Sequence, residues 1–186
     1  MRRWIAAALL VAAPTATPAQ QGAVVVQLNG GVLAFPRAPE VSPGAAFGLN
    51  VGLEPLGPIG LELGYQGAAY TERAELPGEE DAVALENGGY AALKLAPLSG
   101  TVEPYLLAGV GLSHINAVDA PDEGRTLRDD TVAKVPVGVG LDLEMGLFAV
   151  GVRGAWSFLF ENQNALTGRA RGADQMSGTL HIGAAF

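Results

Sequence analysis

Apolar side chains recur at every second position along most of this chain, and this period of two constrains its fold more than any other feature. Successive side chains of a β-strand point to opposite faces, so such a segment has one apolar face and one polar or small face. The last segment, 175–186, places on its apolar face Met176, Leu180, Ile182, Ala184 and Phe186. The pattern predicts an all-β fold.

Alternation and chain-breaking residues divide the chain into eight segments. Each is long enough to cross the apolar core of a bilayer as a tilted strand, which takes about 9–11 residues. In one of them Leu106 and Leu107 are apolar on both parities, a pattern that suggests a β-bulge. The expected strands are 24–35, 44–54, 59–70, 85–95, 102–116, 132–144, 148–161 and 175–186.

The connections between these segments alternate in length. Those at 55–58, 96–101 and 145–147 are short, whereas the others are longer and richer in charge, proline or glycine. Short turns at one end and long loops at the other are typical of a transmembrane barrel with both termini on the turn side. We therefore expect an eight-stranded antiparallel up-and-down transmembrane β-barrel, in preference to a soluble barrel.

A transmembrane barrel and a soluble barrel place the apolar face of the strands on different sides of the wall. A transmembrane barrel directs Leu49, Val139 and Val152 outward to lipid, whereas a soluble, lipocalin-like barrel would bury them in its lumen. Aromatic residues near the expected strand ends fit interfacial girdles. They are Phe35, Phe47, Trp156, Phe158 and Phe160 toward the long loops, and Tyr105, Phe148 and Phe186 toward the short turns.

The N-terminus has the layout of a secretory signal peptide. Arg2 and Arg3 give a positive start, an apolar run follows from Trp4 to Ala13, and small residues end at Ala19. We expect residues 1–19 to be cleaved and residues 20–186 to form the barrel. Removing the two arginines changes the net charge from −8 to −8 − 2 = −10.

Composition narrows the chemistry that this chain can perform. The acidic balance repels phosphate backbones, which argues against a nucleic-acid partner. The chain has no cysteine and only two histidines, so it offers no disulfide, zinc–thiolate site or thiol nucleophile. The expectation is no cofactor and no metal site. The mean hydropathy is positive, as suits a barrel that exposes apolar surface to lipid.

The strand number, the loop asymmetry and the terminal run from Leu180 to Phe186 together resemble the small eight-stranded outer-membrane barrels of the OmpA, OmpX and OmpW kind. The resemblance covers the whole mature chain but includes no periplasmic peptidoglycan-binding domain. It implies a monomer in the outer membrane of a Gram-negative envelope, in contact with membrane lipid and lipopolysaccharide. It also implies recognition by the outer-membrane assembly machinery through a C-terminal signal formed by Leu180, Ile182, Ala184 and Phe186.

Inward-facing polar residues are the candidate functional cluster. Eight strands enclose a lumen just wide enough for side chains to fill. Glu62 and Lys94, and likewise Asp142 and Arg153, lie on neighbouring strands at similar height, so both are expected to form cross-strand pairs. We expect Asn29, Asn50 and His181 at similar height, and a structural polar plug in preference to a proton path, an ion path or a gate.

Acidic runs occupy two of the long loops, at 72–81 and 119–130. They could gather divalent cations beside lipopolysaccharide phosphates, but their spacing fits no calcium-loop motif. A solvated charge run is the preferred interpretation.

The sequence offers little sign of an enzyme. Lipid A deacylases share the eight-stranded architecture and use serine, histidine and an acid, and here Ser113 and His114 are the one adjacent serine–histidine pair. Neighbours in a strand point to opposite faces, so one cannot readily activate the other. We expect a non-enzymatic barrel with a structural or surface-interaction role. The alternative is a narrow, porin-like passage or binding barrel for small apolar molecules, since Gly48, Gly52, Gly138 and Gly140 could leave room inside.

Overall fold

The computed structural model is a closed barrel of eight antiparallel strands, each paired with its neighbours in sequence and the last paired with the first. It describes residues 23–39, 41–56, 58–72, 81–98, 100–118, 130–160 and 174–186. The expected signal peptide and most of the two acidic runs lie outside these residues. The strands are β1 Ala23–Ala34, β2 Gly44–Leu56, β3 Ile59–Glu72, β4 Ala82–Leu95, β5 Val102–Val118, β6 Asp130–Met145, β7 Phe148–Phe160 and β8 Gln175–Ala185.

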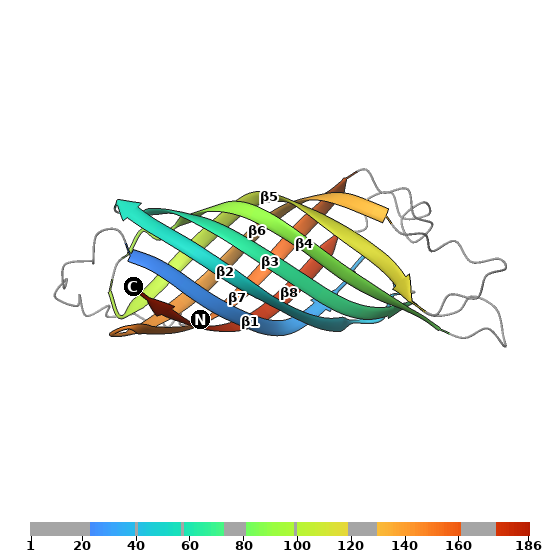
Figure 1. The fold of residues 1–186 in the computed structure, drawn as a ribbon, viewed down its shortest axis with the longest axis horizontal. Helices are drawn as coiled ribbons and strands as arrows, with labels where there is room; N and C mark the ends of the chain where they lie inside the picture. The colour runs from blue at the N-terminus through green and yellow to red at the C-terminus, as the bar shows by residue number, and fades with distance from the viewer. Residues whose placement is uncertain are drawn as a thin grey trace, which may run out of the picture.

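The two ends of the barrel differ as the sequence predicts. The connections β2–β3, β4–β5 and β6–β7 lie at one end, called here the turn end, together with the C-terminus (Figure 1). The longer connections lie at the opposite, loop end. In the turn between β6 and β7, Gly146 has a φ of 70°, a left-handed conformation that residues with a side chain rarely adopt.

The wall is apolar on its outside, which confirms the outward orientation predicted from alternation. Leu49 is 42% exposed, Val139 60% and Val152 49%. A water-soluble barrel would place these side chains inside. Among the described residues, no helix is long and apolar enough to cross a membrane.

The bulge expected in segment 102–116 does not form. β5 keeps one register with β4 and one with β6 along its whole length. The irregularity lies instead between Leu53 and Leu56, where β2 turns into β3. Leu106 points outward and Leu107 inward, where it packs with Tyr105 and Ala92, so both parities of β5 are apolar because its inner face contributes to a small core.

Two aromatic residues assigned to the girdles lie inside the barrel. Tyr105 is 2% exposed, and Phe35 packs on Tyr70 with ring centroids 4.8 Å apart. The parity of Tyr105, which it shares with the buried Glu103, takes it into the lumen. Phe47, Phe158 and Phe160 are exposed on the outer wall toward the loop end, and Phe148 and Phe186 toward the turn end.

Candidate functional site: the polar lumen

Charged and amide side chains fill the lumen in two layers that cross it. All of them come from inward positions of the strands, and most of their contacts join strands that are not neighbours. The buried members are Gln27, Asn50, Glu62, Glu86, Lys94, Glu103, Lys134, Asp142, Gln175 and His181; Asn29, Tyr90 and Arg153 are half-buried.

Arg153 is the centre of the layer nearer the turn end. From β7 its guanidinium reaches across to Glu62 on β3, with Nη1–Oε1 and Nη2–Oε2 distances of 2.7 Å each. The same group donates to the Tyr105 hydroxyl through Nε at 2.9 Å and to the Tyr90 hydroxyl through Nη1 at 3.1 Å. A two-pronged guanidinium–carboxylate pair of this kind is among the strongest hydrogen-bonded arrangements in proteins.

A second chain of contacts lies beside it. Lys94 Nζ is 2.9 Å from Glu103 Oε1 and 3.1 Å from Asp142 Oδ2. Asp142 also contacts His181, with Oδ1 2.6 Å from Nε2. Both cations lie near the ring of Tyr105, with Lys94 Nζ 4.8 Å and Arg153 Cζ 5.4 Å from its centroid. This geometry adds a cation–π attraction between the ring and each cation.

The expected pairs Glu62–Lys94 and Asp142–Arg153 are therefore wrong, although all four side chains point inward. Glu62 pairs with Arg153, and Asp142 with Lys94. In the β3–β4 register Glu62 lies opposite Ala92, and in the β6–β7 register Arg153 lies opposite Gly140. The lumen of eight strands is narrow enough for a long side chain to reach the far wall, so the charges pair across it.

The remaining expected residues also lie in this layer. Asn29 Nδ2 donates to Asn50 Oδ1 at 3.3 Å, and Asn50 is 1% exposed. The Tyr90 hydroxyl lies 3.0 Å from Asn50 Oδ1 and 2.7 Å from Glu62 Oε1. Tyr90 thereby links the two asparagines to the Arg153–Glu62 pair.

Sequence reasoning missed the second layer, which lies nearer the loop end. Lys134 on β6 contacts Glu86 on β4 and donates to Gln175 Oε1 on β8, and Gln175 Nε2 donates to Glu86 Oε2 at 2.6 Å. The three side chains close a triangle across the lumen. The alternation assigns all three side chains to inward positions. They lie on three different strands, however, and no pattern in the sequence indicates that they meet.

Aromatic rings occupy the space above inward glycines. A Cβ on Gly140 would lie 2.2 Å from the Tyr105 ring, and one on Gly64 would lie 2.3 Å from the Tyr90 ring. A Cβ on Gly48 would meet the Asn29 side chain at 2.9 Å. The glycines at 48 and 140 make room for neighbouring side chains and do not widen the lumen, contrary to the suggestion from sequence.

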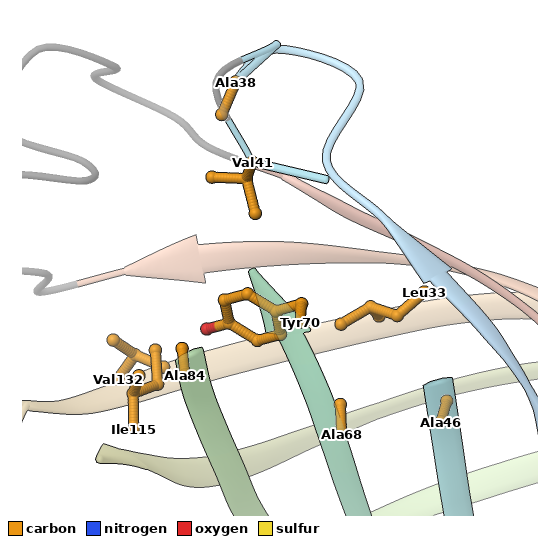
Figure 2. Packing of buried hydrophobic residues seen from close by; sticks show 9 residues of the cluster. All are labelled: Leu33, Ala38, Val41, Ala46, Ala68, Tyr70, Ala84, Ile115 and Val132. Atoms are coloured by element: carbon orange, nitrogen blue, oxygen red, sulfur yellow. The ribbon is translucent and has the colours of Figure 1, made fainter. Parts of the chain in front are cut away.

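An apolar cluster closes the lumen at the loop end (Figure 2). Ala38 and Val41, from the connection between β1 and β2, lie over the inward side chains of Leu33 and Tyr70. Backbone bonds from Ala38 N to Phe35 O and from Val41 N to Ala38 O hold this cap. The other members of the cluster are Ala46, Ala68, Ala84, Ile115 and Val132.

A small cavity remains near the turn end. Its lining includes the side chains of Gln27, Glu62 and Lys94, together with Gly52 and Gly60. Among the described residues, no group of three or more histidine, cysteine, aspartate or glutamate side chains has the arrangement of a metal site.

No protein-family model and no curated protein sequence matches the chain. Solved structures with the same architecture do match. Neisserial surface protein A superposes with a TM-score of 0.58 at 14% identity, covering 89% of this chain and all of its own. OprG from Pseudomonas aeruginosa gives 0.58 at 13% identity, with 89% and 96% covered. The chain has the fold of the small eight-stranded outer-membrane barrels.

Ail, the attachment invasion locus protein of Yersinia pestis, is a third structure with this fold. In a complex with the heparin analogue sucrose octasulfate, it superposes with a TM-score of 0.57 at 13% identity, and 90% of this chain and 100% of Ail are covered. Identities this low show a shared fold and leave function to be argued from the site.

The adjacent Ser113 and His114 do not form a catalytic pair in this barrel. Ser113 is buried on the inner face of β5 and is 5% exposed. His114 is exposed on the outer face, where its Nδ1 lies 3.1 Å from Thr131 Oγ1. The wall separates the two side chains, as the alternation predicts.

Proposed function

We propose that this protein is a non-enzymatic outer-membrane barrel with a closed lumen, and that it acts as a structural or surface-interaction element of a Gram-negative envelope. The observation that carries the proposal is the pair of charged layers across the lumen, inside a wall whose outer face is apolar. A structural barrel needs an intact wall and exposed loops, and this role does not require an open lumen.

The pairing of charges inside the barrel supports the proposal of a closed lumen. A charge moved into a dry interior costs several kcal/mol unless it is paired. Here each charged side chain has an opposite charge within contact distance. Such a network stabilises one arrangement of the interior and blocks the path of a hydrated ion.

The location and partners belong to the same proposal. The apolar outer wall suits membrane lipid and lipopolysaccharide, and the barrel is proposed to act as a monomer. Residues 1–19 are the proposed export signal, and the outward residues Leu180, Ile182, Ala184 and Phe186 are the proposed signal for the assembly machinery. Ail is solved with a polysulfated sugar, which the acidic balance of this chain makes an unfavourable ligand.

Conductance of the refolded protein in a planar bilayer tests the closed lumen. We expect no steady current, because the Arg153–Glu62 pair and the Lys134–Glu86–Gln175 triangle span the interior. A steady ion current, abolished by replacing Gly138 or Gly140 with leucine, would contradict the proposal.

Binding of small apolar molecules is a second candidate, favoured by the apolar cluster under the cap. Leu33, Tyr70 and Val132 are buried in this cluster and give the loop end of the lumen an apolar lining. An apolar fluorescent probe that gains emission with the refolded barrel, and loses that gain when Ala38 is replaced by tryptophan, would support it. Equal emission from the wild-type protein and from empty vesicles would exclude it.

A further inference from the structure

A row of polar side chains crosses one side of the largely apolar outer wall. Asn87 on β4 lies opposite His114 on β5, and His114 lies opposite Thr131 on β6. Tyr65 on β3 is two residues from Gly67, the position opposite Asn87. All four side chains are exposed, and they are called here the polar row.

The polar row is bonded internally but keeps groups for an outside partner. The Tyr65 hydroxyl donates to Asn87 Oδ1 at 2.5 Å, and His114 Nδ1 lies 3.1 Å from Thr131 Oγ1. These contacts leave the amide hydrogens of Asn87 and the Nε2 of His114 for other hydrogen bonds. None of the four side chains is a carboxylate, an ammonium or a guanidinium.

Apolar surface borders the row on both sides along β4 and on the turn side along β5. On β4, Leu85 is 39% exposed and Val83 37% on the loop side, while Leu93 is 60% exposed on the turn side. On β5, Leu112 comes directly before the row on the turn side and is 62% exposed, whereas the next outward residue on the loop side is the half-exposed Asn116. The outward positions described on β1, β2, β7 and β8 are apolar residues or glycine throughout. The row is therefore a local feature of one side of the wall.

The position of the row identifies its occupant, given the membrane location proposed above. Thr131 is the second residue of β6 and His114 is the fifth residue from the loop end of β5, so these two lie toward the loop end, whereas Tyr65 lies near the middle of β3. Polar groups beside lipid need hydrogen-bond partners, because an unsatisfied group there costs several kcal/mol. Amide, hydroxyl and imidazole groups suit the hydroxyls of a sugar better than a choline or ethanolamine head, which has none.

We propose that the polar row docks the hydroxyl-bearing sugar head group of a glycolipid in the loop-side leaflet. The acyl chains of that lipid lie against the exposed side chains of Leu93, Val110 and Leu112. An amphiphile of this shape satisfies both the row and the apolar surface next to it.

The test compares vesicles of phosphatidylcholine with the same vesicles containing lipid A. The full barrel is refolded into both, and the urea midpoint of unfolding is measured for the wild type, Asn87→Leu/His114→Leu and the control Thr71→Val. Thr71 is a polar residue of outward parity on β3 outside the row. We expect lipid A to raise the midpoint of the wild type and the control, and at least a twofold smaller rise for the double variant.

Two results would overturn the proposal: an undiminished rise in the double variant, or no rise in the wild type. Gel mobility without heating reports whether the double variant is folded, and if it is not, His114→Leu with Tyr65→Phe replaces it. A barrel that inserts into neither vesicle contradicts the membrane location itself. That failure is distinct from insertion without any response to lipid A.

Discussion

Replacing Arg153 with methionine removes the cation at the centre of the lumen and keeps most of the volume of its aliphatic stem. Glu62, which is 3% exposed, then loses both of its 2.7 Å contacts with the guanidinium. The Tyr105 hydroxyl loses its 2.9 Å donor. The Tyr90 hydroxyl can still donate to Glu62, from which it lies 2.7 Å, but one neutral hydrogen bond does not balance a buried charge.

The expected cost follows from the burial of both partners. The side chain of Arg153 is 10% exposed and that of Glu62 4%, so solvent screens the pair little. Breaking a buried pair by removing one partner costs about 3–5 kcal/mol, and the lost Tyr105 hydrogen bond adds about 1 kcal/mol. At about 1.4 kcal/mol per factor of ten, the folding equilibrium falls by roughly three to four orders of magnitude.

A double variant separates charge burial from packing. Glu62→Leu with Arg153→Met leaves no charge from this pair in the lumen, and replacing both partners with apolar groups is often close to neutral. We expect its free energy of unfolding to lie within about 2 kcal/mol of the wild type, well above that of Arg153→Met alone.

Urea unfolding in lipid vesicles measures these differences. Tryptophan fluorescence serves as the probe, because the chain has two tryptophans and removal of the expected signal peptide leaves Trp156 alone. Two results would refute the argument that Arg153 neutralises a buried carboxylate. One is a loss of stability in the double variant equal to the sum of the losses of its two single variants. The other is an Arg153→Met barrel as stable as the wild type.

Three further outcomes follow from the structure. Gly140→Val should lower stability by about 1–3 kcal/mol through overpacking against Tyr105, with Tyr105→Leu restoring part of the loss; an unchanged urea midpoint would show that the ring can move aside. Lys134→Met should destabilise the barrel and Glu86→Gln should partly rescue it, by the same measurement; additive losses would contradict the closed triangle. Deleting Phe186 should lower the yield of heat-modifiable barrel in outer-membrane fractions without changing its synthesis; an undiminished yield would remove Phe186 from the assembly signal.

Alternation predicted the strands and their faces well because it records a local property of each strand. The expected segment 44–54 and the observed Gly44–Leu56 begin at the same residue, and parity alone placed Glu62 and Arg153 inside. Which inward charges meet depends on the register of all eight strands together. No segment of sequence contains that information, so the pairing across the lumen could not be predicted.

The residues of the second layer were missed for the same reason. Glu86, Lys134 and Gln175 lie far apart along the chain and meet only where β4, β6 and β8 surround the lumen. Tyr105 was misplaced because aromatics near strand ends were read as girdle residues. Its parity, shared with Glu103, was the stronger signal.

The pairing of interior charges across the lumen has a kinetic consequence. Arg153 and Glu62 are 91 residues apart, and Lys94 and Asp142 are 48 apart. A hairpin of neighbouring strands cannot form either contact, although β4 and β5 together can pair Lys94 with Glu103. A half-built sheet that enters the membrane would therefore carry Glu62, Asp142 and Arg153 unpaired. Contacts this distant in sequence form late and slow folding. The last step of assembly, in which β1 meets β8, should therefore be a single cooperative event that pairs these charges together, and an open sheet should not accumulate as a stable intermediate.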